Sequence, residues 1–285
     1  MKTIGFVDYY ISEWHANNYP IWFKEIAEKS GKDFVVKYAW AEQYVSPVDG
    51  RNTDEWCEAF GVERCATLEE LCEKADYIVV LAPSNPEKHL EYVKTAFKYK
   101  KNTYVDKTFA PDFATAKAIF DVAEKYGTKF FSSSALRYAS ELDKLGGGKA
   151  VLTLGGGGSF EEYIIHQAEM LVKLACARPV AVTVNLKGAG QYICDVEFEG
   201  GKVGTMIYSN ELPYTACAED EKGNSRYTGI ASPFFNNLLA DILRFFEEGE
   251  SSFDVNETLS VMCLREMAVK GKCELGKKIV IGETK

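Results

Sequence analysis

The sequence lacks several features that would assign it at once to a class of protein. It has no run of about 20 apolar residues that could cross a membrane. Its N-terminus has no basic segment followed by a long apolar stretch, so we expect no signal peptide. It has no cluster of lysine and arginine, and the net charge is −9. We therefore expect neither a membrane nor a nucleic acid as partner.

Paired cysteines and clustered histidines are missing as well. The eight cysteines form no C-x-x-C motif, and a chain of 285 residues can bury a core without disulfides. Without an export signal we expect reduced thiols and a cytoplasmic protein. The three histidines, His15, His89 and His166, are far apart and show no paired metal-ligand spacing. We therefore expect no structural metal.

A glycine-rich turn is missing where the pattern favours one. Residues 3–7 (TIGFV) predict a short buried strand, and a helical pattern follows, which is how dinucleotide-binding folds begin. Such a turn normally carries G-x-G-x-x-G. After Gly5, however, the next glycine is Gly31, and residues 8–12 read DYYIS. The sequence therefore indicates either a nucleotide site without glycines or a nucleotide fold with an altered site.

The segments that are present in residues 1–138 alternate between strand and helix patterns. Strands are predicted at 33–40, 75–83, 103–107 and 129–135. Helices are predicted at 67–75, 84–100 and 112–127, the last with Asp112 as N-cap and Gly127 as stop. This alternation predicts a Rossmann-type, doubly wound parallel sheet.

The pattern changes near residue 140. A short strand, KAVLTL, lies between two glycine runs, and a helix is predicted at 160–175. Three segments beginning at 177, 191 and 201 predict antiparallel strands, with a tight turn at 199–202. Two helices, 233–249 and 255–271, follow. We therefore predict a smaller α+β domain over 139–285 with a mainly antiparallel sheet. The run GGGGS (155–159) fits a flexible linker or a close backbone approach, and we favour the second.

Candidate ligand-binding residues stand at the carboxyl ends of the predicted strands, where open parallel sheets bind ligands. Glu42 ends the second strand and could accept hydrogen bonds from a ribose, or could simply be solvated. Ser84 and Asn85 open a helix, so they could cap it or help to hold a phosphate. The complete set at these strand ends is Asp8, Tyr9, Tyr10, Ile11, Glu42, Ala82, Pro83, Ser84, Asn85 and Asp106.

Three residues have side chains suited to proton transfer. Lys107 follows a short apolar strand, where partial desolvation would lower its pKa, although a surface lysine beside Asp106 is the alternative. Glu162 and His166 are four residues apart and share a helix face. A carboxylate can orient an imidazole for a proton relay. The flanking apolar residues also fit a histidine buried for structural reasons.

From residue 76 onward the motifs resemble those of the glucose–fructose oxidoreductase and inositol dehydrogenase family (the Gfo/Idh/MocA group). That family has an apolar strand ending in proline and then a histidine in the next helix, as Pro83 and His89 stand here. A strand ending in Glu-Lys-Pro follows, where this chain has Asp106-Lys107-Thr108. A glycine run and Asp-x-x-x-His come next, here Gly155–Gly158 and Glu162-x-x-x-His166. The closing helices are similar too.

The resemblance implies a nicotinamide cofactor, NAD or NADP, over the first domain, with His89 among its contacts, and a sugar-like or polyol substrate. By carry-over, Lys107 contacts the substrate hydroxyl, and Glu162 and His166 act as the acid/base pair. The family's second-domain sheet commonly packs against another subunit, so we expect a homodimer or higher homo-oligomer.

The sequence also departs from the family. The glycine fingerprint is absent, Glu-Lys-Pro has become Asp-Lys-Thr, and a glutamate replaces the catalytic aspartate. The connection after Arg137 is short, so the resemblance is to a divergent and shortened member. Two functions stay open. One is an NAD(P)-dependent oxidoreductase that acts by hydride transfer. The other is a non-catalytic member with a degenerate cofactor site, serving small-ligand sensing or a protein interaction.

Overall fold

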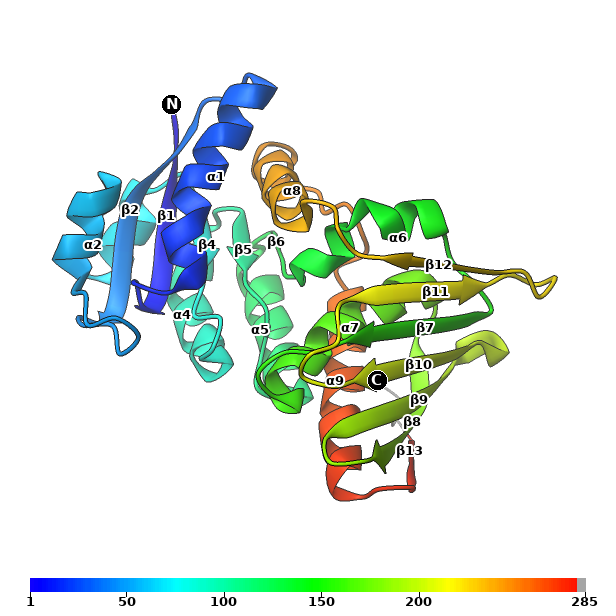
Figure 1. Cartoon of the computed structure of the whole chain (residues 1–285). Coiled ribbons are helices and arrows are strands. Elements are labelled where there is room, and N and C mark those ends of the chain that lie inside the picture. The colour runs from blue at the N-terminus through cyan, green and yellow to red at the C-terminus, as the bar shows by residue number, and fades with distance from the viewer. Residues whose placement is uncertain (281–285) are drawn as a thin grey trace. The chain divides into compact units, whose positions relative to one another are not determined.

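In the computed structural model, which describes residues 1–280, the chain folds as two units (Figure 1). The first comprises Met1–Ser133 and Leu238–Val255, and the second comprises Ser134–Asn237 and the described residues from Asn256 onward. The sequence placed the boundary after residue 138. It did not anticipate that Leu238–Val255 returns to the first unit.

The first unit is built on six parallel strands in the order β3-β2-β1-β4-β5-β6, so the predicted doubly wound sheet is confirmed. Right-handed crossovers place α1 and α2 on one face of such a sheet and α3, α4 and α5 on the other. The strands are β1 (Lys2–Tyr10), β2 (Phe34–Gln43), β3 (Glu63–Arg64), β4 (Tyr77–Val80), β5 (Thr103–Val105) and β6 (Phe130–Phe131). The helices are α1 (Trp14–Ser30), α2 (Thr53–Phe60), α3 (Leu68–Lys74), α4 (His89–Ala96) and α5 (Phe113–Tyr126).

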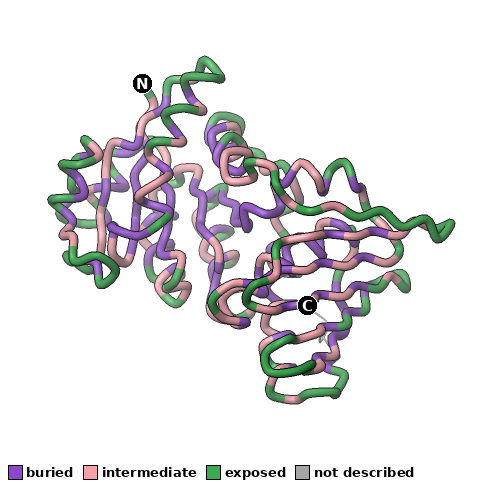
Figure 2. Tube along the Cα trace, in the orientation of Figure 1, coloured by how far each residue is buried: buried purple, intermediate pink, exposed green. Residues whose placement is uncertain are grey.

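The central strands are buried on both faces, as their unbroken apolar sequences predict. Ile78, Val79 and Val80 of β4 are completely buried. Figure 2 shows the same burial along the central strands of the first unit. Because both faces are covered by helices, the polar edge at the carboxyl ends of the strands is where this unit can place a site.

Several elements of this unit differ from the prediction. The helix α2 and the strand β3 were not predicted, and the strand expected at 129–135 is limited to Phe130–Phe131. The helix expected at 84–100 is divided into a 3-10 turn at Pro86–Lys88, α4, and a second turn at Phe97–Tyr99. The helix α8 (Phe234–Glu248) contributes Phe245 and Phe246 to the first unit, where their rings contact Phe131 and Tyr77. This aromatic packing explains why Leu238–Val255 belongs to the first core.

The second unit contains a seven-stranded sheet in the order β12-β11-β7-β10-β9-β8-β13. Only β7 and β10 pair in parallel, so the predicted mainly antiparallel sheet is confirmed. The strands are β7 (Ala150–Gly155), β8 (Pro179–Lys187), β9 (Gln191–Phe198), β10 (Val203–Tyr208), β11 (Thr215–Glu219), β12 (Ser225–Gly229) and β13 (Lys278–Val280). The helices are α6 (Ser140–Leu145), α7 (Phe160–Ala175) and α9 (Glu257–Cys273).

The glycine run between β7 and α7 is a close backbone approach, as we favoured, and not a linker. A Cβ on Gly156 would lie 1.9 Å from the backbone oxygen of Ser209, and one on Gly155 would lie 2.3 Å from the Tyr214 ring. Only glycine leaves room for these neighbours. The run therefore fixes the start of α7, which carries Glu162 and His166.

Candidate functional site

The carboxyl ends of β1, β4 and β5 form a buried polar cluster in the first unit. Asp8 is 1% exposed, and its Oδ1 accepts the N–H groups of Tyr9 at 2.7 Å and Ala82 at 3.1 Å. Ala82 has a left-handed backbone (φ 53°), which the hydrogen bond to Asp8 helps to hold. Asp106 is equally buried, and its Oδ2 lies 2.7 Å from Nδ1 of His15.

The N-terminus of α1 is capped by a carboxylate from its own chain. The side chain of Glu13 accepts the N–H of His15 at 2.8 Å and also the N–H of Ala16. Glu13 is only 6% exposed. A helix N-terminus attracts anions because its first N–H groups have no partner within the helix. Here Glu13 supplies that anion.

Three carboxylates therefore lie in one buried region with one imidazole. Burial raises the pKa of Asp8 well above its usual value, and the charge of Glu13 raises it further. Burial also raises the pKa of Glu13, although His15 and the two N–H groups oppose this. Burial disfavours the ionised form of Asp106 too, but His15 and Lys107 together outweigh it and leave the pKa lowered. Within residues 1–280, no group of three or more His, Cys, Asp or Glu side chains is arranged to hold a metal ion.

As it stands, this turn does not fit the pyrophosphate of a dinucleotide. The pyrophosphate would accept the same first N–H groups of α1 that Glu13 already holds. It would also bring negative charge close to Asp8, whose Oδ2 has no hydrogen-bond partner among the described residues. Any ionised fraction of Asp8 would repel the pyrophosphate strongly at low dielectric. The chain therefore departs from a dinucleotide-binding domain at the position that matters most for the phosphates.

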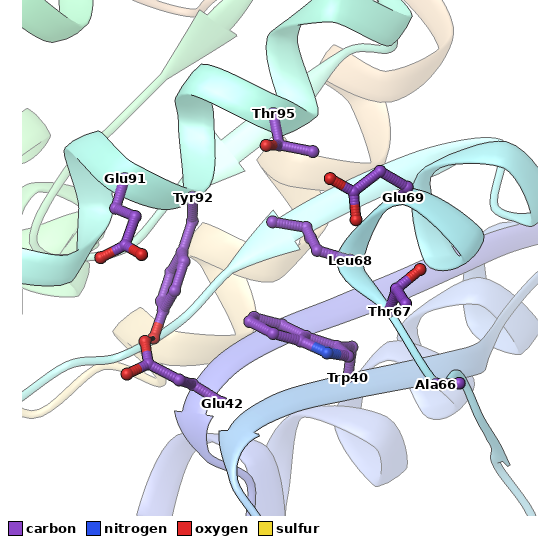
Figure 3. A pocket seen from close by; sticks show the side chains of 9 residues that line it. All are labelled: Trp40, Glu42, Ala66, Thr67, Leu68, Glu69, Glu91, Tyr92 and Thr95. Atoms are coloured by element: carbon purple, nitrogen blue, oxygen red, sulfur yellow. Dashed lines mark hydrogen bonds between the residues drawn. The ribbon is translucent and has the colours of Figure 1, made fainter.

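Glu42, the predicted ribose residue, is already engaged at the end of β2. Its carboxylate accepts hydrogen bonds from Lys88 Nζ at 2.7 Å and from the Tyr92 hydroxyl at 2.8 Å. Burial raises its pKa, but the bonds from Lys88 and Tyr92 outweigh this, and the pKa is lowered. A cavity of about 350 Å³ lies beside it (Figure 3). Its lining residues are Trp40, Glu42, Ala66, Thr67, Leu68, Glu69, Glu91, Tyr92 and Thr95.

The first strand extends beyond the predicted residues 3–7, so Tyr9 and Tyr10 are the last residues of β1, and both are half-buried. The rings of Tyr9 and Tyr10 are 5.8 Å apart, and Lys88 Nζ lies 5.2 Å from the centre of the Tyr9 ring. Ile11 is 1% exposed. Tyr9, Lys88 and Glu42 thus form one contact series along this edge of the sheet.

The residues after β4 determine the backbone conformation of the loop that follows this strand. Pro83 and Ser84 follow the left-handed Ala82, and Asn85 donates from Nδ2 to Glu87 at 3.0 Å without capping the following turn. His89 is fully buried between two carbonyl oxygens, with Nε2 2.6 Å from that of Leu81 and Nδ1 2.9 Å from that of Phe109. Burial lowers its pKa. His89 thus joins the loop after β4 to the loop after Lys107.

Lys107 lies where the sequence placed it, directly after β5. Its side chain is half-buried and its charge lowers the pKa of the neighbouring Asp106. The peptide bond between Lys107 and Thr108 is cis. Lys107 belongs to the first unit, whereas Glu162 and His166 belong to the second.

In the second unit, His166 contacts a serine side chain. Nδ1 of His166 lies 2.7 Å from Oγ of Ser134, which also accepts the N–H of Leu136 at 3.2 Å. The rings of Tyr163 and Tyr214 lie near the imidazole, with their centres 5.7 and 5.9 Å from its centre. Glu162 is half-buried one turn earlier on α7, and its N–H donates to the N-cap residue Ser159.

A buried ion pair supports this arrangement. Glu169, one turn beyond His166, accepts the N–H of Ser134 at 3.3 Å and pairs with Arg137. Arg137 also reaches Glu257 at 2.7 Å. Burial disfavours the charge on Arg137, but these two glutamates outweigh it and raise the pKa. The backbone that carries Ser134 is therefore held by α7 itself.

Sequence reasoning missed Glu13, His15 and Ser134. For Glu13 a signal existed, because residues 8, 10 and 13 have the spacing of G-x-G-x-x-G. Ser134 gave no signal, because it lies 32 residues from His166 and meets it only in the folded unit.

Comparisons with known proteins agree with the fold. Residues 41–134 match a family model described as an oxidoreductase family with an NAD-binding Rossmann fold. The matched residues include Glu42, Asp106 and Lys107 and begin after the first turn. A search of curated sequences gave no match.

Several solved structures share the fold over nearly the whole of both chains. A myo-inositol dehydrogenase from Corynebacterium glutamicum is 13% identical, covers 99% of this chain and 99% of its own, and has a TM-score of 0.76. A scyllo-inositol dehydrogenase from Lactobacillus casei with bound NAD(H) and scyllo-inositol is 12% identical, covers 99% of this chain and 99% of its own, and has a TM-score of 0.74. An oxidoreductase from Agrobacterium radiobacter in complex with NAD+, L-tartaric acid and magnesium is 14% identical, covers 99% of this chain and 98% of its own, and has a TM-score of 0.75.

Proposed function

We propose that this chain, whose residues 41–134 belong to the Gfo/Idh/MocA oxidoreductase family, acts on a sugar-like or polyol ligand as an NAD(P)-dependent oxidoreductase. The observation that carries the proposal is the imidazole of His166, with Ser134 at Nδ1 and the rings of Tyr163 and Tyr214 beside it. An aromatic wall and an oriented imidazole suit a ligand rich in hydroxyl groups. The first turn does not fit the dinucleotide as it stands, so the proposal rests on the groups that would handle the ligand.

The proposed roles concern the proton of a ligand hydroxyl. Oxidation of an alcohol requires a base for that proton, and imidazole titrates near neutral pH. We assign the proton exchange to the imidazole of His166, which Ser134 contacts at Nδ1. Glu162 shares its helix face and is the proposed carboxylate partner. Lys107 is proposed to contact the ligand hydroxyl.

A second function is favoured by a different observation. The Glu13 cap on α1 favours a non-catalytic member of the family that senses a small ligand or binds another protein. In that case polyols would bind without any dependence on a dinucleotide. The eight free cysteines are compatible with the cytoplasm, which we propose as the compartment for either function. No helix within residues 1–280 is long and apolar enough to cross a membrane.

Fluorescence titration with NADH and NADPH separates the two functions. The oxidoreductase predicts binding of one of them, and turnover with a panel of polyols that includes myo-inositol and scyllo-inositol. Turnover should be lost in His166→Gln and Lys107→Met but kept in Lys98→Met, a control at an exposed position of the first unit. If neither cofactor binds at millimolar concentration while a polyol raises the melting temperature, the non-catalytic function is supported instead.

A further inference from the structure

The first turn places acidic and aromatic side chains where a dinucleotide-binding turn needs glycines. The spacing G-x-G-x-x-G falls on Asp8, Tyr10 and Glu13. The first glycine allows the tight turn, the second lets the backbone approach the pyrophosphate, and the third allows the helix to pack closely on the strand. All three positions are changed together, and two of them carry buried carboxylates.

Glu13 occupies the position that the ligand's anion would take. Its two carboxylate oxygens accept the N–H groups of His15 and Ala16, which lie in the first turn of α1. A bound phosphate is held at a helix N-terminus by the same kind of N–H group and by the helix dipole. A ligand phosphate and the Glu13 carboxylate therefore compete for the same donors.

Asp8 is an independent second observation, because it belongs to β1 and not to the helix. It is buried, and its Oδ2 has no hydrogen-bond partner among the described residues. Its Oδ1 takes the N–H of Ala82 from the loop after β4. A second backbone donor at this edge of the sheet is thus also held by a carboxylate of the chain.

The turn is also fixed from outside. Ser46, in the loop between β2 and α2, donates its hydroxyl to the carbonyl of Ser12 at 2.6 Å, and Ser12 donates to Asp49 at 2.8 Å. Ser12 and Ser46 are both buried. The turn therefore has a defined, closed conformation in which Glu13 is kept against the helix.

We infer that Glu13 is a built-in anion that decides whether a dinucleotide is admitted: a pyrophosphate can bind at α1 only when the Glu13 carboxylate leaves the helix N-terminus. The inference rests on the proposed function only for the class of ligand. It assigns a specificity-determining role to a residue whose carboxylate accepts two backbone N–H groups in this structure. Only molecules in which Glu13 has left the helix N-terminus can bind. The apparent affinity for a dinucleotide therefore equals the intrinsic affinity multiplied by the fraction of such molecules.

The test compares Glu13→Ser with Glu13→Asp. Serine keeps a good N-cap but removes the charge, whereas aspartate keeps both the cap and the charge. Isothermal titration with NADH should show weak but measurable binding for the parent chain and for Glu13→Asp. Glu13→Ser should bind at least about tenfold more tightly than the parent. Glu28→Ser, at an exposed position of α1, is the matched control and should not change binding.

Three outcomes would overturn the inference. One is a parent chain that binds NADH as tightly as Glu13→Ser does. Another is an equal gain in NADH affinity in Glu13→Asp, because that variant keeps the negative charge and changes only the length of the side chain. The third is a folded Glu13→Ser that still binds no dinucleotide. Folding is checked by circular dichroism, and Asp8→Asn with Glu13→Ser provides a second variant with less negative charge. Polyol binding, measured without NADH, reports on the proposed function separately.

Discussion

Buried carboxylates distinguish the first unit at the scale of single residues. A carboxylate that loses its water must be compensated by hydrogen bonds or by an opposite charge. Asp106 has His15 for this purpose, whereas Asp8 has only two backbone N–H groups on one oxygen. The sequence predicted that Asp8 would stand at the end of β1. It did not predict this shortage of partners, which depends on groups that only folding brings together.

Asp8 should make the protein less stable as the pH rises. Its pKa is raised in the folded state, so the folded protein binds this proton more tightly than the unfolded chain does. The stabilisation is fully present below the unfolded pKa of about 4 and is lost as the pH rises toward the folded pKa. Asp8→Asn should therefore gain stability relative to the parent between pH 4 and pH 7, by about 1–2 kcal/mol. Urea unfolding at several pH values measures it, and a constant difference would contradict it.

The hydrogen bond with Ser134 should determine the orientation of the His166 ring. In Ser134→Ala the hydrogen bond to Nδ1 is lost, so we expect the ring-nitrogen signals of His166 in NMR to move while those of His15 and His89 stay unchanged. If the proposed oxidoreductase turns over scyllo-inositol, kcat should fall about tenfold with a smaller change in KM. Ser134→Thr should restore both readouts. Unchanged His166 signals in Ser134→Ala would rule out this role.

At the scale of elements, the glycine run gives the sharpest expectation. In Gly156→Ala the new Cβ would lie 1.9 Å from the backbone oxygen of Ser209, a neighbour that cannot rotate away. We expect a loss of at least about 2 kcal/mol in the free energy of unfolding, a typical cost of overpacking. Gly190→Ala is the control, because nothing lies within 4 Å of its Cβ. Chemical unfolding of both variants should show a large loss only for Gly156→Ala.

Most elements could be predicted because their signals are local. Asp112 and Gly127 bound α5 as its caps, and the apolar run of β4 forms a buried strand. The division of the predicted helix at 84–100 could not be predicted, because it depends on tertiary contacts, among them the burial of His89 and Tyr92. The return of α8 to the first unit depends on rings more than a hundred residues apart in sequence, such as Phe131 and Phe245.

At the scale of the whole molecule, both architectures followed from the order of elements. Alternating strands and helices require a parallel sheet, and adjacent strands joined by tight turns require an antiparallel one. The family match covers residues 41–134, so the first turn, where the chain departs most from the family, lies outside it. Function is therefore hardest to predict at that turn, since sequence resemblance supplies no guide there.

The second unit should associate through the face of its sheet that carries Leu154, Ile207 and Ile193. These residues are directly paired on β7, β10 and β9, and all three are half-exposed. Asp195 and Thr205 on the same face are joined by a hydrogen bond, so we expect a partly polar interface. Ile207→Asp should convert a homodimer to a monomer, because a charge in the middle of an interface loses its water. Ile21→Asp is the control, because the side chain of Ile21 on α1 is exposed, and this variant should stay dimeric. Light scattering at micromolar concentration gives the masses, and a parent chain of monomeric mass would contradict the prediction.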